Sequence, residues 1–424
     1  MSINGSVTHQ QPGMRNAGRY QMKTNNCEKV KTMSIILIVC AALVATLFID
    51  AAPAKCRHSE LISKFQSPQW SEGKFRNELN TYSESILKIL GAQMKNKAKH
   101  QIPSSAVPVI NPNSEIFTHL PPSGLRVTWL GHSSVLVEID GYRVLTDPVW
   151  SDRASPISFA GPKRFFGPPL PLNKLPEIDA VVISHDHFDH LDEQTIKALK
   201  DRVPLFAVPL GVGEHLVKWG VDPYKIAEHD WWDSTTVGTL KLTATPARHF
   251  SGRSLTEINN NPTLWSGWSI AGPDHRIYYS GDTAMFPGFK EIGNRLGPFD
   301  LTLIEAGAYN AMWPDVHIGP EQAVEAHRML RGKLMMPVHW GTFDLALHNW
   351  TEPAERIIAA ANRKNVSVVI PKPGESFEPK SPPQLTRWWP KVPWQTAEKS
   401  PIVSTGLSNE IAYIDHTLIV ENSK

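Results

Sequence analysis

Residues 185–190, with the sequence HDHFDH, restrict the possible structures of this chain more than any other feature. Three histidines and Asp189 stand here at the spacing HxHxDH. An apolar run, AVVIS at 180–184, precedes them, and the acidic start of segment 192–200 predicts a helix after them. A turn between a strand and a helix lets neighbouring side chains point to different sides of a cavity. One turn of this kind can therefore supply ligands to two metal ions.

The residue types in this turn are those that bind zinc. A neutral imidazole nitrogen binds zinc at about 2.0–2.1 Å, and a carboxylate oxygen binds it at about 2.0–2.2 Å. A charged surface loop is the alternative interpretation. The full spacing between a strand and a helix is much more specific than a single HxH pair, and it favours a metal site.

Three more ligand-type side chains, His249, Asp282 and His339, each come just after a β-type run (LKLTATPAR, IYYSG and KLMMPV). Side chains at strand ends converge on one edge of a sheet. Each residue alone could be a structural polar residue, but together with the turn they predict one site. The predicted ligands of two zinc ions are His185, His187, Asp189, His190, His249, Asp282 and His339.

Cysteine is confined to the first 56 residues, at Cys27, Cys40 and Cys56. The remaining chain therefore has no internal disulfide, no cysteine zinc site and no thiol nucleophile. Its histidines must carry the metal chemistry. The net charge of +2 and the lack of a basic platform interleaved with aromatic residues make nucleic acid an unexpected partner.

The order of predicted elements indicates an α/β fold. The run 126–139 alternates, Asp140-Gly141 is a hairpin turn, and 142–146 returns. Hairpins followed by mixed strands and helices predict two packed mixed sheets with helices on the outer faces, the αββα arrangement. Further strands are expected at 178–183, 240–246, 264–271, 276–280, 299–304, 334–338 and 366–370, and helices at 192–200, 319–329 and 352–362.

Composition along the chain predicts several segments. A catalytic α/β domain over 125–376 is flanked by a lead-in and an extension rich in proline. The expected segments are 1–32, basic and disordered; 33–52, a hydrophobic anchor or signal-like segment; 53–124, a lead-in that packs on the main domain; 125–376, the catalytic domain; and 377–424, the extension.

The apolar run 34–49 is short for a spanning helix, which needs about 20 residues. Its basic flank favours a cytoplasmic N-terminus. A short single-pass anchor and a signal peptide cut near Ala52 or Ala54 are both open, and a buried core helix is the third alternative. The first two predict a membrane-associated, endomembrane protein whose main body faces the secretory lumen or the exterior.

The ligand pattern resembles that of the metallo-β-lactamase superfamily. Because no cysteine is available, it is most similar to the phosphodiesterase and lactonase branches, whose sites are built from histidine and aspartate. Asp147, in LTDP, could orient a ligand histidine or merely cap a turn. The resemblance implies that His185, His187 and His249 hold the first zinc ion, that Asp189, His190 and His339 hold the second, and that Asp282 bridges both.

Residues 125–376 also resemble one family in more detail, the phospholipases D that hydrolyse N-acylphosphatidylethanolamine. This resemblance includes loops that contain no ligand, so it is more specific than the metal pattern. The matching stretches are 125–138 (LRVTWLGHSSVLVE), 145–148 (LTDP), 153–156 (RASP), 161–165 (GPKRF), 178–192, 230–232 (DWW), 264–272 (LWSGWSIAG), 281–283 (GDT), 292–301, 307–309 (GAY), His317 with 320–324, and 339–343 (HWGTF).

This resemblance implies a zinc-dependent phosphodiesterase that releases N-acylethanolamine and phosphatidic acid, acts at a membrane surface and forms a homodimer. His317 and Asp189 are the implied catalytic residues, and His317 would orient the phosphate or protonate the leaving alkoxide. Ser158 and Phe159 are the implied substrate-binding residues, together with His317, on a loop whose aromatic and cationic side chains suit a membrane interface. A metallo-lactonase or other ester hydrolase is the alternative, and an inactive metal- or lipid-binding scaffold is a weaker one.

Overall fold

The structure is a computed structural model that describes residues 64, 66–95, 98–254 and 260–407. The chain divides into two compact units, Met1–His58 and Ser59–Lys424, and all the described residues belong to the second. The segments predicted at 1–32 and 33–52 lie outside the described residues. Among the helices that are described, none is long and apolar enough to cross a bilayer.

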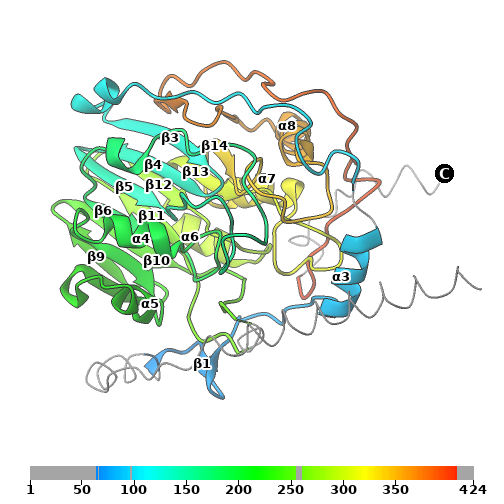
Figure 1. Cartoon of the computed structure of the whole chain (residues 1–424), viewed down its shortest axis with the longest axis horizontal. Helices are drawn as coiled ribbons and strands as arrows, with labels where there is room; N and C mark the ends of the chain where they lie inside the picture. Colours follow the sequence, from blue (N-terminus) through cyan, green and yellow to red (C-terminus); the bar gives the residue numbers. More distant parts are fainter. Residues whose placement is uncertain (1–63, 65, 96–97, 255–259, 408–424) are drawn as a thin grey trace, which may run out of the picture. The chain divides into compact units, whose positions relative to one another are not determined.

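Two sheets form the centre of the described unit (Figure 1). The first has the strand order β15-β3-β4-β5-β6-β7-β8. Its β15, β3, β4 and β5 pair in antiparallel fashion, and β5 to β8 run parallel. Its strands are β3 (Leu125–Gly131), β4 (Ser134–Ile139), β5 (Tyr142–Thr146), β6 (Ala180–Val182), β7 (Phe206–Pro209), β8 (Ile226–His229) and β15 (Ser376–Phe377).

The second sheet has the order β14-β13-β12-β11-β10-β9. Strands β12, β13 and β14 are parallel, and the remaining pairs are antiparallel. A separate two-stranded hairpin joins β1 (Trp70–Ser71) and β2 (Lys74–Phe75). The strands of the second sheet are β9 (Ser234–Val237), β10 (Leu240–Thr245), β11 (Gly267–Ala271), β12 (Arg276–Tyr279), β13 (Phe299–Glu305) and β14 (Gly332–Val338).

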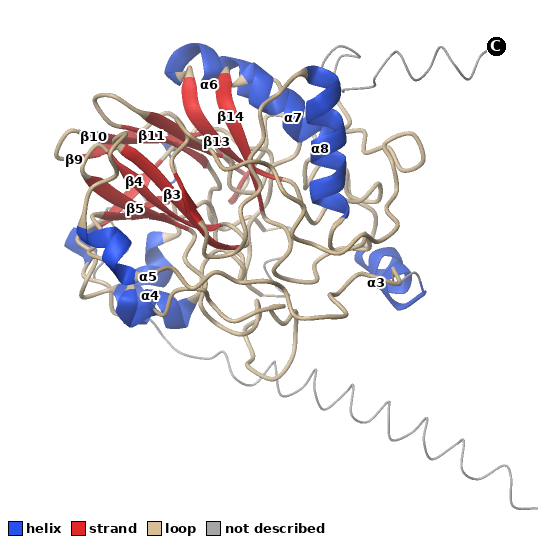
Figure 2. Cartoon of the chain, turned by 90° about the horizontal axis from the view of Figure 1, so that it is seen from above, coloured by secondary structure: helices blue, strands red, loops and turns tan. Residues whose placement is uncertain are grey.

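Helices lie outside both sheets, which gives the predicted αββα layers (Figure 2). In that view α4 and α5 lie beside the sheet of β3 to β5, and α6, α7 and α8 lie beside β13 and β14. The helices are α3 (Ile86–Lys95), α4 (Glu193–Leu199), α5 (Gly213–Lys218), α6 (Gly288–Leu296), α7 (Pro320–Met329) and α8 (Glu352–Lys364), with 3₁₀ turns at Ser114–Thr118, Leu172–Lys174 and Pro223–Lys225. The expected fold class and the three expected helices are confirmed.

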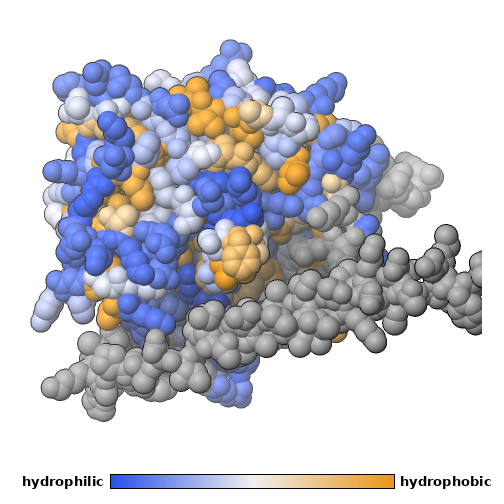
Figure 3. All heavy atoms as spheres, viewed as in Figure 1, coloured by the Kyte–Doolittle hydropathy of each residue, from blue (hydrophilic) through white to orange (hydrophobic). Residues whose placement is uncertain are grey.

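The alternating residues of β4 enter two different cores. Val135 and Val137 belong to the core between the sheets, whereas Leu136 packs with Ile196 of α4 and Leu216 of α5. Successive side chains of a strand point to opposite faces, so both faces of this strand are covered. On the face that Figure 3 shows, the hydrophobic residues that remain at the surface form separate patches among hydrophilic ones.

Tryptophans from distant segments complete the core between the sheets. Trp129 of β3 stacks on Trp340, with ring centroids 5.6 Å apart. Trp388 and Trp389, from the segment that follows β15, also pack against Trp340, and each ring centroid lies 5.5 Å from that of Trp340. Aromatic side chains bury large apolar areas, so this segment contributes directly to the core.

Segment 366–370 is not a regular strand, in contrast to the prediction. Val368 forms an isolated parallel bridge with Met335. Asn365, which ends α8, has a left-handed backbone with φ 54°, and Pro371 and Pro373 follow the segment. Proline has no N–H to donate to a strand ladder, so the pairing cannot extend.

A buried ion network fastens β3, β4 and β5 to one another. Arg126 Nη2 lies 2.8 Å from Glu138 Oε1, and Arg143 Nε lies 3.3 Å from the same oxygen. The two guanidinium groups also donate to the carbonyl oxygens of Ile116 and Phe117. The Glu138 carboxylate thus neutralises two cations and holds a 3₁₀ turn on the sheet.

Replacing Glu138 by glutamine should leave the buried guanidinium group of Arg126 and the half-buried one of Arg143 without this counter-charge. We expect the free energy of unfolding to fall by about 3–5 kcal/mol, measured by urea denaturation. The control is Glu193→Gln, which removes an ion pair with Lys197 whose side chains are 40% and 44% exposed. That change should stay below about 1 kcal/mol. Equal losses in both variants would contradict the role of Glu138.

Candidate metal centre

The seven predicted ligands come together at the ends of strands from both sheets. The turn that follows β6 supplies His185, His187, Asp189 and His190, and the first sheet therefore provides four side chains. The second sheet supplies three more, which follow β10, β12 and β14 as the sequence predicted: His249, Asp282 and His339.

The first group of donors consists of His185, His187, His249 and Asp282, whose donor atoms all lie within 4.8 Å of one another. His187 Nδ1 is 2.8 Å from His185 Nε2 and 3.3 Å from His249 Nε2. The Nε2 atoms of His185 and His249 are each 3.8 Å from Asp282 Oδ2. Three imidazoles and one carboxylate thus face a common point.

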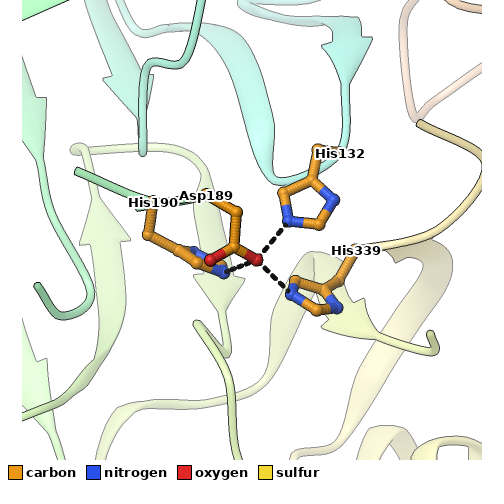
Figure 4. Close-up of side chains that lie close together, drawn as sticks. All are labelled: His132, Asp189, His190 and His339. Atoms are coloured by element: carbon orange, nitrogen blue, oxygen red, sulfur yellow. Dashed lines mark hydrogen bonds and ion pairs between the residues drawn. The ribbon is translucent and has the colours of Figure 1, made fainter. Parts of the chain in front are cut away.

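The second group contains Asp189, His190, His339 and a residue that was not predicted, His132 (Figure 4). Asp189 Oδ2 lies 3.0 Å from His132 Nε2, 3.2 Å from His339 Nε2 and 3.4 Å from His190 Nε2. Three imidazoles from three different loops therefore surround one carboxylate oxygen.

Asp282 lies between the two groups. Its Oδ1 is 3.2 Å from His190 Nε2, and its Oδ2 is 3.1 Å from His339 Nε2. The same Oδ2 faces His185 and His249 of the first group at 3.8 Å. A carboxylate in this position could bridge two cations.

Unpartnered polar atoms show that these residues fit a metal. Both carboxylate oxygens of Asp282 and Nε2 of His190 are buried and form no aligned hydrogen bond with any described residue. Buried polar atoms are nearly always hydrogen-bonded, so such a cluster needs an explanation. Imidazole nitrogens and carboxylate oxygens are the donors that zinc and related cations take.

The electrostatics of the first group also suit a metal. Burial holds the pKa of His185 and His249 well below the usual value, and it also lowers the pKa of His187. These imidazoles are therefore neutral at physiological pH. Neutral imidazole is the form that binds a metal ion.

In the second group, the positive charge comes from protons on His190 and His339. Burial opposes the charged form of His190 and His339, but the carboxylates of Asp282 and Asp189 raise the pKa of His190 well above normal and that of His339 to about 10. Burial disfavours ionised Asp189 and Asp282 as well, but the adjacent imidazoles hold their pKa well below normal. A metal cation would take over the charge of these protons and release them.

Asp147 lies behind His190. Its Oδ2 is 2.6 Å from His190 Nδ1 and accepts a hydrogen bond from Tyr279 OH at 2.5 Å. Its Oδ1 accepts from the Ser184 N–H at 2.7 Å, and Ser184 Oγ also bonds to the carboxylate. The second nitrogen of a metal-binding histidine commonly bonds to a carboxylate, which fixes the orientation of the ring. Asp147 is in that position.

His317 lies at the rim of the first group. Its Nδ1 is 3.0 Å from Glu305 Oε2 and 3.7 Å from Asp282 Oδ2. Glu305 Oε1 also accepts from the backbone N–H groups of Thr283, at 3.0 Å, and Ile318, at 2.9 Å. Glu305 thus holds the loops that carry Asp282 and His317. Burial lowers the pKa of His317 to about 4, so its imidazole is neutral.

Sequence reasoning missed His132 and Glu305. His132 follows β3 directly, and Glu305 is the last residue of β13, so both obey the same strand-end rule as the predicted residues. His132 lies inside the alternating run that the sequence predicts at 126–139. Its backbone has φ 52° instead, a left-handed conformation that separates β3 from β4.

Ser158 and Phe159 are not among the residues brought to the donor groups. They are exposed on the loop between Arg153 and Lys163, which pair through an isolated bridge, and Phe159 is 81% exposed. The cavity beside His339 is lined by other side chains, including Phe165, Trp340, Phe343 and Trp350.

Replacing Asp147 by asparagine should weaken the binding of the metal ion beside His190. The amide keeps the size but loses the charge that orients the imidazole, so we expect about 10- to 100-fold lower metal affinity. Competition with a chromophoric chelator measures it. The control is Asp140→Asn, a carboxylate bonded to His275 in a hairpin outside the donor groups, which should leave affinity unchanged. Equal affinity of both variants would contradict this role.

Comparisons with known proteins agree with this geometry. The beta-lactamase superfamily domain matches residues 142–340. An uncharacterized protein of Mycobacterium tuberculosis is 47% identical over 333 residues, which cover 76% of this chain and 88% of the relative. The N-acyl-phosphatidylethanolamine-hydrolyzing phospholipase D 1 of Caenorhabditis elegans is 38% identical over 291 residues, 65% of this chain and 81% of the relative. A metal-dependent hydrolase of Pyrobaculum aerophilum is 30% identical over 257 residues, 59% of this chain and 98% of the relative.

These findings converge on one family. The αββα layers place candidate metal-binding clusters of histidine and aspartate at the strand ends of two mixed sheets. The domain match spans β5 to the residues just after β14, and relatives at 30–47% identity extend over most of their own length. This chain belongs to the metallo-β-lactamase superfamily and is a metal-dependent hydrolase of that fold.

Proposed function

We propose that this chain is a zinc-dependent phosphodiesterase of the phospholipase D type. It hydrolyses N-acylphosphatidylethanolamine to N-acylethanolamine and phosphatidic acid. The observation that carries the proposal is the pair of donor groups that share Asp282. The similarity to the Caenorhabditis elegans enzyme supports the choice of substrate.

The proposed ligands follow the two donor groups. The first zinc ion is held by the three imidazoles around His187, and the second by the donors around Asp189, with Asp282 as the bridge. The short contacts within each group and the unpartnered oxygens of Asp282 support this assignment. The full set is His185, His187 and His249 for one ion, and Asp189, His190 and His339 for the other.

A phosphodiester suits such a centre. When bound, a pair of zinc ions lowers the pKa of water and neutralises negative charge on phosphoryl oxygens. The donors of this chain converge from two sides of Asp282, so two oxygens of one phosphate can face the two groups. Positive charge placed where negative charge develops is commonly the largest contribution to catalysis.

His317 is proposed to orient the phosphate. Burial raises the pKa of Glu305 well above its usual value, so its carboxyl group can donate to Nδ1 of His317, and the proton on Nε2 is then free for a substrate oxygen. A pKa of about 4 makes the ring neutral at physiological pH, and this favours orientation over protonation of the leaving group. Glu305 fixes the ring 3.7 Å from Asp282, and this position supports the proposed role.

A surface cavity near the centre is the proposed place for the lipid substrate. A cavity of about 480 Å³ is lined by the exposed Ile102 and Lys163 and by Phe165 and Asp344. The cavity beside His339 is lined by the same Phe165 and Asp344. The two hollows therefore adjoin, and the one beside His339 has a volume of about 20 Å³, the space of one water molecule.

Side chains near the rim of the surface cavity suit a membrane surface. Ile102, Ile157 and Phe159 are 59%, 37% and 81% exposed, and Lys163 lies on the same loop as the last two. Exposed apolar side chains next to a cation match the interface of a bilayer with anionic headgroups. We propose that Ser158 and Phe159 contact lipid at this rim, and that the protein acts at an endomembrane as a homodimer.

The direct test is product analysis with the purified full-length chain. With N-acylphosphatidylethanolamine in mixed micelles and zinc, we expect N-acylethanolamine and phosphatidic acid in equal amounts, identified by mass spectrometry. Chelation should abolish the reaction and added zinc should restore it. Hydrolysis of a lactone or carboxylic ester without cleavage of the phosphodiester would instead establish the alternative ester hydrolase.

His317→Asn tests the proposed contact with phosphate. The asparagine amide can take the place of Nδ1 beside Glu305 but is too short to replace Nε2, so we expect kcat to fall by about 100-fold or more while zinc content stays at the wild-type level. The matched control is His327→Asn, which changes a buried histidine bonded to Thr302 behind the second sheet. Loss of zinc from His317→Asn would show that His317 is a ligand, and unchanged kcat would refute its role.

A further inference from the structure

We propose that His132 is a positioning residue of the metal centre. Its Nε2–H donates a hydrogen bond to Asp189 and holds that carboxylate in the orientation needed for the second metal ion. This inference rests on the proposed ligand set. It adds a residue outside that set, and it assigns a task to the loop between β3 and β4.

The contact between the two side chains is direct. His132 Nε2 lies 3.0 Å from Asp189 Oδ2, within the range of an N–H···O hydrogen bond (Figure 4). The His132 ring is buried. Its centroid lies 4.1 Å from that of the His339 ring and 5.1 Å from that of Phe343, which it meets edge-on. With so little free space around it, the imidazole is locked in place.

The contacts of His132 differ from those of the proposed ligands. His190 and His339 each lie within 3.4 Å of both Asp189 and Asp282. Within 4.0 Å, by contrast, His132 approaches Asp189 and no other described carboxylate. An imidazole that bound the second ion should face both of its carboxylates. His132 reaches only the outer one, which indicates that it acts through Asp189.

The other ring nitrogen indicates where the proton lies. Nδ1 of His132 is buried and has no hydrogen-bond partner among the described residues. A proton on Nδ1 would have no acceptor, whereas a proton on Nε2 has Asp189. Nδ1 of His339 is also unpartnered, so this feature alone does not separate the two rings. The two rings differ in that His339 contacts Asp282, whereas His132 does not.

The backbone of His132 is fixed from three sides. Its N–H donates to Thr342 Oγ1 at 2.6 Å, and its carbonyl oxygen accepts from Trp129 Nε1 at 2.9 Å. The same carbonyl accepts from the His339 N–H at 3.1 Å. These bonds hold a non-glycine residue at φ 52°, a strained conformation that the surroundings must enforce. The ring is thus aimed at Asp189 before any metal binds.

The test compares His132→Gln with His132→Asn. The glutamine amide reaches nearly as far as the imidazole Nε2 and can donate to Asp189. Asparagine tolerates the left-handed backbone better but is too short to reach. If the left-handed backbone alone sets zinc affinity, His132→Asn should bind zinc more tightly than His132→Gln. If the hydrogen bond to Asp189 sets it, His132→Gln should bind more tightly. His327→Gln is the control for the loss of a buried histidine outside the centre.

Zinc alone is the probe, added to the metal-stripped full-length chain with a competing chromophoric chelator. We expect His132→Asn to bind its weaker zinc ion about 10- to 100-fold less tightly than the wild type. His132→Gln and His327→Gln should stay within about threefold of the wild type, since the first retains the donor and the second lies outside the centre. Weakened binding in both His132 variants, or in neither, would overturn the proposal.

The unmodified chain provides a second measurement, which decides the matter if a variant fails to fold. X-ray absorption of the zinc-loaded wild type should show five imidazole ligands per two ions, those of His185, His187, His190, His249 and His339. A sixth would make His132 a ligand and refute the positioning role. Neither measurement involves lipid, so a chain that binds zinc as expected but leaves N-acylphosphatidylethanolamine intact would overturn the proposed function alone.

Discussion

The centre depends on one buried carboxylate shared by two clusters of imidazole. Asp282 faces donors of both groups at 3.1–3.8 Å, and its two oxygens form no aligned hydrogen bond with any described residue. A charge removed from water in this way is tolerated only if opposite charge lies close by. The surrounding residues, from Asp147 behind His190 to Glu305 behind His317, keep those partners in place.

Much of this arrangement could be predicted from the sequence because metal ligands require few residue types at strand ends. The HDHFDH turn and the three later residues, His249, Asp282 and His339, were found by that rule, and the structure brings them together. The αββα layers followed from the order of hairpins, strands and helices. The helices at 192–200, 319–329 and 352–362 could be located from their acidic or proline-containing first turns, since these signals are local.

The features that were missed depend on tertiary structure. His132 stands within an apparently continuous β pattern, and only its left-handed backbone turns the ring toward Asp189. Glu305 is a fully buried acid at the end of an apolar strand, whereas acidic residues are rarely found buried. Segment 366–370 has the composition of a strand, but the flanking Asn365 and prolines prevent regular pairing.

The hydrogen bond from the His339 N–H to the His132 carbonyl crosses between the two sheets, because β14 belongs to one sheet and β3 to the other. The donor groups cross the same boundary, since each takes side chains from both sheets. A cation held there would act as a cross-link that closes the sandwich at one edge. A metal ion that binds only the folded form increases the free energy of unfolding. The thermodynamic stability of this fold would therefore depend on the concentration of free metal in the compartment where the protein resides.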